Sequence, residues 1–208
     1  MNATATATVN TSAASNYDEA ADYIWNNSFD KPTLVVSRAR VGVQYDALQA
    51  GLGDARIHYA VKANPAPEII RMLVERGSGF DAASRQEIEL CLSQGADPAK
   101  ISFGNTIKRG VDIAFAHSIG VTMFAADCEA ELDKIAEHAP GARVYIRLIV
   151  ENSMADWPLT RKFGCAGSLL PSLLEYTKSV GLVPYGLSFH VGSQTRRAEY
   201  WHPVLDQV

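Results

Sequence analysis

The amino-acid sequence predicts an α/β fold, a parallel barrel of strands surrounded by helices, with about six of the eight strands of such a barrel present. From Thr33 onward, short apolar runs alternate with segments whose apolar residues recur at helical intervals. Strands separated by helices of this length form right-handed βαβ units, which build a parallel sheet. No Gly-x-Gly-x-x-Gly follows the first strand, so a barrel is favoured over a doubly wound dinucleotide-binding sheet, which stays the alternative.

Short apolar runs mark the predicted strands. The first precedes the barrel, and the others alternate with predicted helices, as βα units require. In chain order the runs cover residues 33–37, 57–62, 79–82, 101–104, 122–125, 143–149 and 184–190.

The segments between these runs carry apolar residues three or four positions apart, which is the spacing of a helix with one buried face. Ile69, Ile70 and Leu73 illustrate the pattern. Glycines that end helices are found at positions 77, 95, 120 and 181. The predicted helices cover residues 68–76, 85–94, 110–118, 129–138 and 168–180.

Residues 31–208 are predicted to form one partial barrel domain, preceded by a disordered tail and a connecting segment at residues 1–30. Residues 1–14 are rich in Ala and Thr and lack the basic start and apolar core of a secretory signal. About six strands fit between residues 57 and 190, whereas a closed barrel has eight. The chain reaches Val208 inside a predicted helix, so we expect it to be part of a longer protein.

Composition excludes several classes of function. The net charge of -4 offers no basic surface for nucleic acid. No segment approaches the ~20 apolar residues that span a bilayer, so no membrane role is expected. Cys91, Cys128 and Cys165 are far apart and odd in number, which argues against a disulfide framework and against a metal site. We expect a cytoplasmic protein.

Lys62 is the first candidate functional residue, because active sites of parallel barrels lie at the carboxyl ends of the strands. It ends the run 57–62 and is followed by Ala63-Asn64-Pro65, which breaks the strand. A lysine desolvated at the barrel mouth has a lowered pKa and is suited to Schiff-base formation. Taken alone, Lys62 fits better as a surface lysine beyond a strand end.

Other strand ends carry polar groups toward the same place. Asp81 ends the segment Gly79-Phe80-Asp81, and Asn105 follows the next run. Arg147 lies in the run 143–149, and His190 ends the last run. Individually, Asp81 and nearby Ser84 fit helix caps, Arg147 an ion pair and His190 a core histidine. Together they predict one site at the barrel mouth.

Four segments carry a resemblance to a known family. The segments are Tyr59-Ala-Val-Lys62-Ala-Asn64, Phe80-Asp81-Ala-Ala-Ser84-Arg-Gln-Glu87, Pro158-Leu-Thr-Arg-Lys162-Phe-Gly164 and Phe189-His190-Val-Gly192-Ser193. In turn they resemble the cofactor lysine, the Phe-Asp segment, the mobile loop and the ring-stacking histidine of the pyridoxal-phosphate-dependent decarboxylases of alanine-racemase fold. This family includes ornithine, diaminopimelate and arginine decarboxylases.

The resemblance implies the cofactor pyridoxal 5'-phosphate and a role for each matching residue. Lys62 would carry the cofactor as a Schiff base, and the Asp81 and Glu87 carboxylates would lie beside it as catalytic groups. His190 would stack on the cofactor ring, and Ser193 would donate a hydrogen bond to its phosphate.

Two further residues receive roles from the same resemblance. Arg147 would order the acidic group that faces the pyridine nitrogen. Lys162 would belong to a loop that closes over the site. In the family, that acidic group, the glycine-rich phosphate loop and the residues that read the distal amine come later in the chain, partly in a C-terminal β-domain absent from this sequence.

The Phe-Asp segment and the loop favour decarboxylation of L-ornithine to putrescine, in polyamine biosynthesis, or of L-lysine. Diaminopimelate decarboxylase, of lysine biosynthesis, is the alternative, since Gln194 extends the match to its His-x-Gly-Ser-Gln pattern. Alanine racemases continue the lysine motif differently from Pro65-Ala66-Pro67.

The resemblance also implies a full-length homodimer with shared active sites. We expect the 208-residue chain alone to be inactive and poorly soluble or unable to dimerise. A non-catalytic truncated paralogue stays open, as does a barrel enzyme that uses Lys62 without a cofactor, although His190 argues against the latter.

Overall fold

The computed structural model describes residues 19–150, 162–193 and 197–206. The chain divides into two compact units, residues 1–55 and 56–208, and each is described by itself. Residues 1–14 of the predicted tail lie outside the described residues, and the predicted domain boundary at residue 30 stays a prediction.

The described part of the first unit, residues 19–55, contains two helices, whereas the sequence predicts one strand there. Helix α1 spans Glu19–Trp25. The strand predicted at residues 33–37 is wrong, because within it Leu34 alone makes an isolated bridge. The run leads directly into a helix, and an apolar run of this length does not by itself distinguish a strand from a helix approach.

Helix α2 spans Arg38–Leu52 and was not predicted. Ser37 caps its first turn, since the Ser37 hydroxyl accepts a hydrogen bond from the Arg40 amide at 3.3 Å. Its apolar residues do not gather on one buried face: Val43, Leu48 and Leu52 are all exposed. A helix without an apolar stripe leaves no periodic signal in the sequence.

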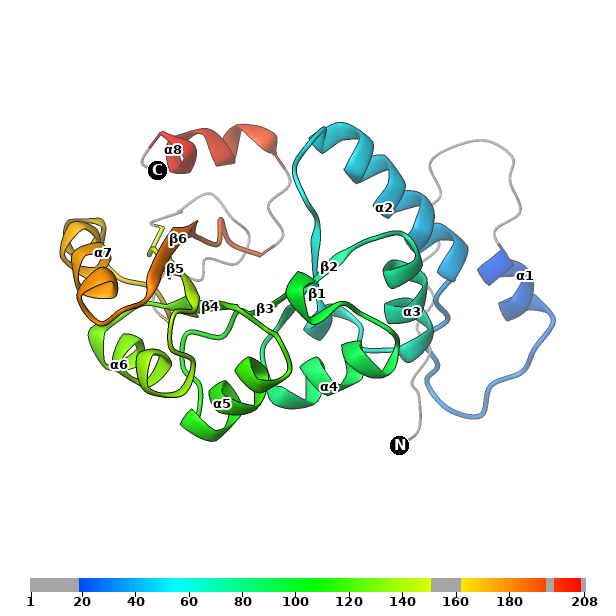
Figure 1. The fold of residues 1–208 in the computed structure, drawn as a ribbon. Helices are drawn as coiled ribbons and strands as arrows, with labels where there is room; N and C mark the ends of the chain where they lie inside the picture. Colours follow the sequence, from blue (N-terminus) through cyan, green and yellow to red (C-terminus); the bar gives the residue numbers. More distant parts are fainter. Residues whose placement is uncertain (1–18, 151–161, 194–196, 207–208) are drawn as a thin grey trace. The chain divides into compact units, whose positions relative to one another are not determined.

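The second unit contains a six-stranded parallel sheet whose strands follow one another in sequence order (Figure 1). All neighbouring strands are parallel, which confirms the predicted βα architecture of an incomplete barrel. The strands are β1 His58–Ala60, β2 Gly79–Ala82, β3 Ile101–Phe103, β4 Met123–Ala126, β5 Arg143–Arg147 and β6 Val183–Ser188.

Five helices connect the strands, and each agrees within two residues at either end with its prediction. Figure 1 shows α4, α5 and α6 side by side along one side of the sheet. They are α3 Pro67–Glu75, α4 Arg85–Ser93, α5 Gly110–Ser118, α6 Glu129–His138 and α7 Leu170–Ser179. The glycines predicted to end helices, at positions 77, 95, 120 and 181, all have positive φ.

Short turns complete the second unit. Three-residue 3₁₀ turns follow β1, precede β3 and lead into α7, and the last described elements are a 3₁₀ turn and a one-turn helix. They are η1 Val61–Ala63, η2 Pro98–Lys100, η3 Gly167–Leu169, η4 Ala198–Trp201 and α8 His202–Leu205.

The sheet has two chemically different faces. Its outer face packs against the helices and carries fully buried apolar side chains, among them Phe80, Phe124 and Ile146. The Phe103 and Phe124 rings lie 6.3 Å apart on this face. Because successive side chains of a strand point to opposite faces, the residues between them point to the inner face.

Three strands end two residues before their predicted apolar runs do: β1, β5, which ends at Arg147, and β6. Strand β1 ends at Ala60, and Lys62 lies in η1 instead of ending the strand. Pro65 follows, and the Asn64 side chain accepts a hydrogen bond from the Ala66 amide at 3.0 Å, which turns the chain toward α3. Strand β6 ends at Ser188, so His190 lies just beyond it.

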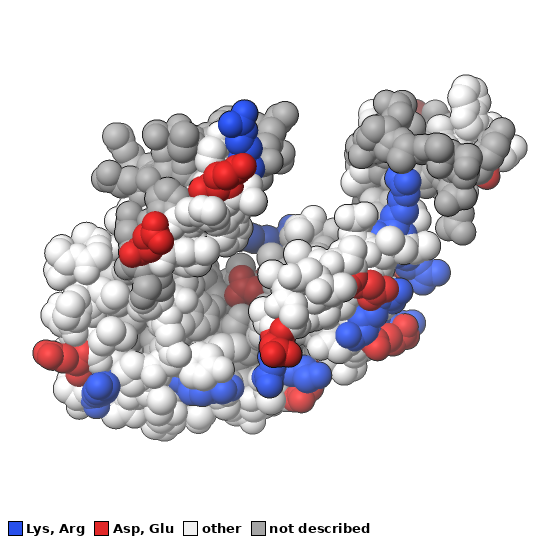
Figure 2. Space-filling view, turned by 90° about the horizontal axis from the view of Figure 1, so that it is seen from above, with Lys and Arg blue, Asp and Glu red and all other residues white. Residues whose placement is uncertain are grey.

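Acidic and basic side chains are interspersed among uncharged ones on the face seen in Figure 2. None of the helices in the described ranges is long and apolar enough to cross a membrane. Within the same ranges, no group of three or more His, Cys, Asp and Glu residues could hold a metal ion. Cys91, Cys128 and Cys165 are free thiols.

Candidate functional site

A cavity of about 350 Å³ opens at the carboxyl ends of the strands of the second unit. Its volume lies in the range of small-molecule sites. Strands β1, β2, β3, β5 and β6 or the turns after them contribute its lining: His58, Ala60, Lys62, Asp81, Ser102, Gly104, Tyr145, Arg147, Ser188, Phe189 and His190. The structure therefore brings together Lys62, Asp81, Arg147 and His190, as predicted.

A larger hollow, of about 620 Å³, lies in the first unit. Its described lining residues are mostly apolar, with Arg38 as the one charged side chain among them. Convergent ionisable groups mark a reactive site, and none converge among these residues, so the smaller cavity is the candidate site.

Lys62 reaches the cavity from η1, beyond the end of β1. We expected a desolvated lysine, but Lys62 is exposed to solvent in the described structure. The difference follows from its position, because a residue in the turn after a strand lies at the mouth of the cavity instead of inside the barrel. Its amine is accessible to a ligand that enters there.

Asp81 lies on the inner face of β2. The Ser102 hydroxyl donates a hydrogen bond to Asp81 Oδ1 at 2.9 Å. Burial raises the pKa of Asp81 above its ordinary range, and the Ser102 hydrogen bond and the positive charges of Lys62 and Arg147 oppose that rise. The carboxyl is thus a group whose charge depends on its neighbours, which is frequent at functional sites.

Glu87 does not line the cavity, because its carboxylate is used at the start of α4. The Ser84 hydroxyl accepts from the Glu87 amide at 3.3 Å, and Glu87 Oε2 accepts from the Ala83 amide at 2.6 Å. The Ser84 bond is that of a capping box, whereas Glu87 reaches one residue beyond the N-cap, to the Ala83 amide. The helix-cap interpretation of Ser84 is confirmed, and the catalytic role of Glu87 stays a prediction.

Arg147 is the last residue of β5, and its guanidinium lies 5.5 Å from the centre of the Phe163 ring. Exposed Lys162 precedes that ring. The segment is fixed to the sheet, because the Cys165 amide donates to the Arg147 carbonyl at 2.9 Å. The Gly164 amide donates to Asp127 Oδ2 at 2.8 Å. Residues 158–161 of the predicted lid lie outside the described residues.

His190 lines the cavity with one ring nitrogen held in place. The Gly192 amide donates to His190 Nδ1 at 2.9 Å, which fixes the ring and leaves the proton of the neutral form on Nε2. Partial removal from water and the positive charges of Arg147 and Lys62 lower the pKa of His190. A neutral, oriented ring is suited to contact a flat ligand face.

Two other predicted residues lie nearby. Ser193 is partly buried beyond β6 and does not line the cavity, whereas Gln194 lies outside the described residues. The Asn105 side chain bridges two loops instead of entering the cavity: Nδ2 donates to the Ala83 carbonyl at 3.4 Å, and Oδ1 accepts from the Ile107 amide at 3.4 Å.

Sequence reasoning missed the inner-face residues at the base of the cavity: His58, Ser102, Gly104 and Tyr145. Ser102 lies beside Asp81 in the sheet register, and Tyr145 lies two positions before Arg147. His58 lies four positions before Lys62, and Gly104 two positions after Ser102. The period of two along a strand was the signal that could have found them, counted back from the strand ends.

The residues that line the cavity fit pyridoxal phosphate. A primary amine, a carboxylate, a guanidinium and an oriented imidazole meet in one space, from Lys62, Asp81, Arg147 and His190 respectively. An amine is what an aldehyde cofactor needs for attachment, and a flat ring beside it suits an aromatic cofactor.

Comparison with known proteins gives the same cofactor class. Residues 38–208 match the family described as pyridoxal-dependent decarboxylase, pyridoxal binding domain. "Decarboxylase flvG" of Aspergillus flavus is 38% identical over 172 residues, 83% of this chain and 40% of that protein. "Lysine/ornithine decarboxylase" of Selenomonas ruminantium is 37% identical over 174 residues, 84% of this chain and 44% of that protein.

Solved structures are similar as well. Lysine decarboxylase from Selenomonas ruminantium has a TM-score of 0.82 at 33% identity, covering 92% of this chain and 50% of that one. A relative named antizyme inhibitor 2, of Xenopus laevis, is 38% identical over 135 residues, 65% of this chain and 30% of that protein. The chain thus spans less than half the length of these curated relatives. It belongs to the pyridoxal-dependent decarboxylase family and carries that family's pyridoxal-binding domain.

Proposed function

We propose that this chain is the cofactor-binding part of a carboxy-lyase that acts on a basic amino acid, L-ornithine or L-lysine, with pyridoxal phosphate. One observation carries the proposal: Lys62, Asp81, Arg147 and His190 converge on one cavity at the carboxyl ends of parallel strands. Relatives named for lysine, ornithine and arginine decarboxylation support the substrate class.

Bound pyridoxal phosphate supplies an electron sink for the electron pair of the broken Cα–carboxylate bond. Lys62 would hold the cofactor through its amine. Asp81 would supply a negative charge near the Lys62 ammonium. His190 would contact the cofactor ring and orient it.

The remaining roles complete the proposal. Arg147 orders the acidic group that faces the pyridine nitrogen, and Ser193 donates a hydrogen bond to the phosphate. Glu87 assists near the Schiff base and Lys162 takes part in closing the site. The full-length protein is a cytoplasmic homodimer with shared active sites and serves polyamine biosynthesis when ornithine is the substrate.

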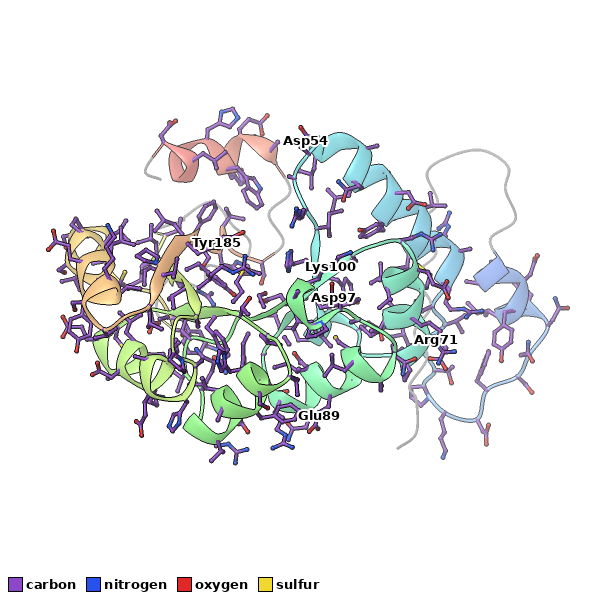
Figure 3. The ribbon with its side chains drawn as sticks, in the orientation of Figure 1. Asp54, Arg71, Glu89, Asp97, Lys100 and Tyr185 are labelled. Carbon is purple, nitrogen blue, oxygen red and sulfur yellow. The ribbon has the colours of Figure 1, made fainter. Side chains whose placement is uncertain are left out.

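A covalent-labelling experiment tests cofactor attachment. The full-length protein that contains this chain is mixed with pyridoxal phosphate and reduced with borohydride, and the modified peptide is identified by mass spectrometry. We expect the label on Lys62 and its loss in Lys62→Ala. Lys100→Ala is the matched control, since Lys100 is an exposed lysine in η2, at the amino end of β3 (Figure 3). A label spread over several lysines would contradict the proposal.

A second experiment tests the reaction. Release of carbon dioxide from L-ornithine, L-lysine, L-arginine and diaminopimelate is measured with the full-length protein that contains this chain. We expect the highest kcat/KM for ornithine or lysine and no turnover after Lys62→Ala. Preference for diaminopimelate would contradict the substrate assignment, and absence of any turnover would favour the non-catalytic paralogue instead of the proposed enzyme.

A further inference from the structure

The base of the cavity is polar on the inner face of the sheet. Barrel interiors are ordinarily filled with bulky branched apolar side chains. Here the inner-face positions of β1, β2, β3 and β5 instead carry His58, Asp81, Ser102 and Tyr145, which all line the cavity. A buried polar group is retained only where other groups satisfy it or where function requires it.

Two hydroxyl groups border the cavity beside the Asp81 carboxylate. Asp81 and Ser102 are opposite one another in the register of β2 and β3, and Ser102 Oγ donates to Asp81 Oδ1 at 2.9 Å. Tyr145, from β5, lines the same cavity, and the electrostatics of its hydroxyl depend on both Ser102 and Asp81. The carboxylate therefore has polar neighbours on two strands besides its own.

Two glycines leave the space for this arrangement. A Cβ at Gly104 would overlap Asp81 Oδ1 and lie 2.6 Å from Asp81 Cγ. A Cβ at Gly79 would lie 2.8 Å from Nδ1 of the His58 ring. Any larger residue at either position would displace the acidic group or the imidazole beside it, so the backbone itself is shaped around the polar base.

We propose that Ser102 and Tyr145 are positioning residues that hold the Asp81 carboxylate at the base of the cavity, facing the Lys62 amine. The inference rests on the proposed function, because the value of a fixed carboxylate lies in its pairing with the cofactor lysine. Neither hydroxyl has a part in the roles assigned above. They act through Asp81.

Electrostatics is consistent with this arrangement. Burial raises the pKa of Asp81, which favours the neutral acid, whereas the Ser102 hydrogen bond and the charges of Lys62, His58 and Arg147 favour the carboxylate. Burial and the Asp81 charge raise the pKa of Tyr145, so its hydroxyl keeps its proton and can donate. Removing either donor should therefore favour the neutral form of Asp81.

A titration of the ligand-free, full 208-residue chain tests the inference without the cofactor. The side-chain carboxyl carbon of Asp81 is followed by ¹³C NMR against pH, with Asp81→Asn to assign the signal. We expect the pKa of Asp81 to rise in Ser102→Ala and again in isosteric Tyr145→Phe. Loss of one hydrogen bond to a charged group weakens the carboxylate form by about tenfold.

Matched variants separate a positioning role from general destabilisation. Ser102→Thr keeps the hydroxyl and should restore the titration. Ser78→Ala removes another buried serine, whose hydroxyl donates to the Gly79 carbonyl at 2.7 Å, and Tyr185→Phe removes an exposed hydroxyl on β6 (Figure 3). Neither of these controls should move the Asp81 titration.

The outcomes distinguish the inference from the proposed function. An Asp81 titration unchanged in both Ser102→Ala and Tyr145→Phe overturns the inference, even where Lys62 is labelled by the cofactor. If Lys62 is not labelled in the native protein but the Asp81 titration shifts in the variants, the proposed function is overturned. The arrangement of hydroxyls and carboxylate is then still supported.

Discussion

Single residues around Asp81 determine whether the cavity can work. The carboxylate is partly buried, accepts a hydrogen bond from the Ser102 hydroxyl, shares the cavity with Tyr145, and fits only because position 104 has no side chain. Sequence reasoning found Asp81 from its place near a strand end. The period of two could have placed Gly104 and Tyr145 on the inner face, but their proximity to Asp81 depends on the register of neighbouring strands, which the sequence pattern does not give.

Gly104→Ala should displace Asp81, because the new Cβ would overlap the carboxylate oxygen. We expect at least about a tenfold loss in the yield of cofactor label on Lys62, as for the loss of a charge-assisted hydrogen bond. Gly186→Ala is the matched control, since a Cβ there meets nothing within 4 Å. Equal labelling of the two variants would show that the Asp81 position is unimportant.

Asp81→Asn should change the dependence of stability on pH. The folded-state pKa of Asp81 is raised above 3.8, so its contribution to stability is fully present below that pH and is lost as pH rises through the folded-state value. The Tm of Asp81→Asn relative to the native chain should therefore increase from acid to neutral pH. Exposed Asp54→Asn should show no such trend (Figure 3); a flat difference for Asp81→Asn would refute the expectation.

At the scale of elements, a buried ion pair fixes the loop after β3 to helix α6. Lys108 Nζ lies 2.8 Å from Glu131 Oε1 and donates to the carbonyls of Asn105 and Ala125 at 2.9 and 2.6 Å. Lys134 contacts the other Glu131 oxygen at 2.6 Å. Burial lowers the pKa of Lys108 despite the attraction of Glu131. The hydrogen bond from Lys108 thereby fixes the backbone of Asn105, which lies beside the cavity.

Removing one partner of this pair should be strongly destabilising. Glu131→Ala leaves Lys108 buried without its carboxylate, which costs about 3–5 kcal/mol in free energy of unfolding. Urea denaturation measures the effect. Glu89→Ala is the control, since it breaks the exposed Arg85–Glu89 pair and should cost about 1 kcal/mol or less. Similar losses in the two variants would contradict the assignment of the buried pair as a structural link.

Elements were predictable where their signal is periodic. Helices α3 to α7 each bury an apolar stripe, and the central strands bury Phe80, Phe124 and Val144 against them, so spacing identified them. Helix α2 has no such stripe. The carboxyl ends of β1, β5 and β6 were misplaced because apolar residues such as Val61, Leu148 and Phe189 continue beyond the strand ends. The spacing of apolar residues indicates which positions are buried, whereas the hydrogen bonds of the strand end before the apolar run does.

At the scale of the whole molecule, β1 and β6 are the outer strands of the sheet among the described elements. Strand β6 exposes Val183 and Tyr185, at 48% and 55% of their surface. An exposed apolar outer strand is a template for pairing with another chain. The βα order of the barrel was predictable from the sequence, whereas the degree of exposure of this edge required the register of β5 and β6.

The 208-residue chain should therefore self-associate through β6. Val183→Lys places a charge on the exposed edge and should lower the mean mass in sedimentation velocity. Leu169→Lys is the control, since Leu169 is exposed to a similar degree, 53%, but lies in η3. A chain that stays monomeric, or equal effects of both variants, would contradict a role for this edge.

The two glycines of the inner face restrict which substitutions can occur during evolution. His58 occupies the space that Gly79 leaves open, and Asp81 occupies the space at Gly104. Each of these side chains therefore fits because the residue that faces it, on or just after the neighbouring strand, is a glycine. Among descendants of this sequence, positions 58 and 79 should change in concert, as should 81 and 104, because each glycine is free to gain a side chain only after its neighbour has become smaller.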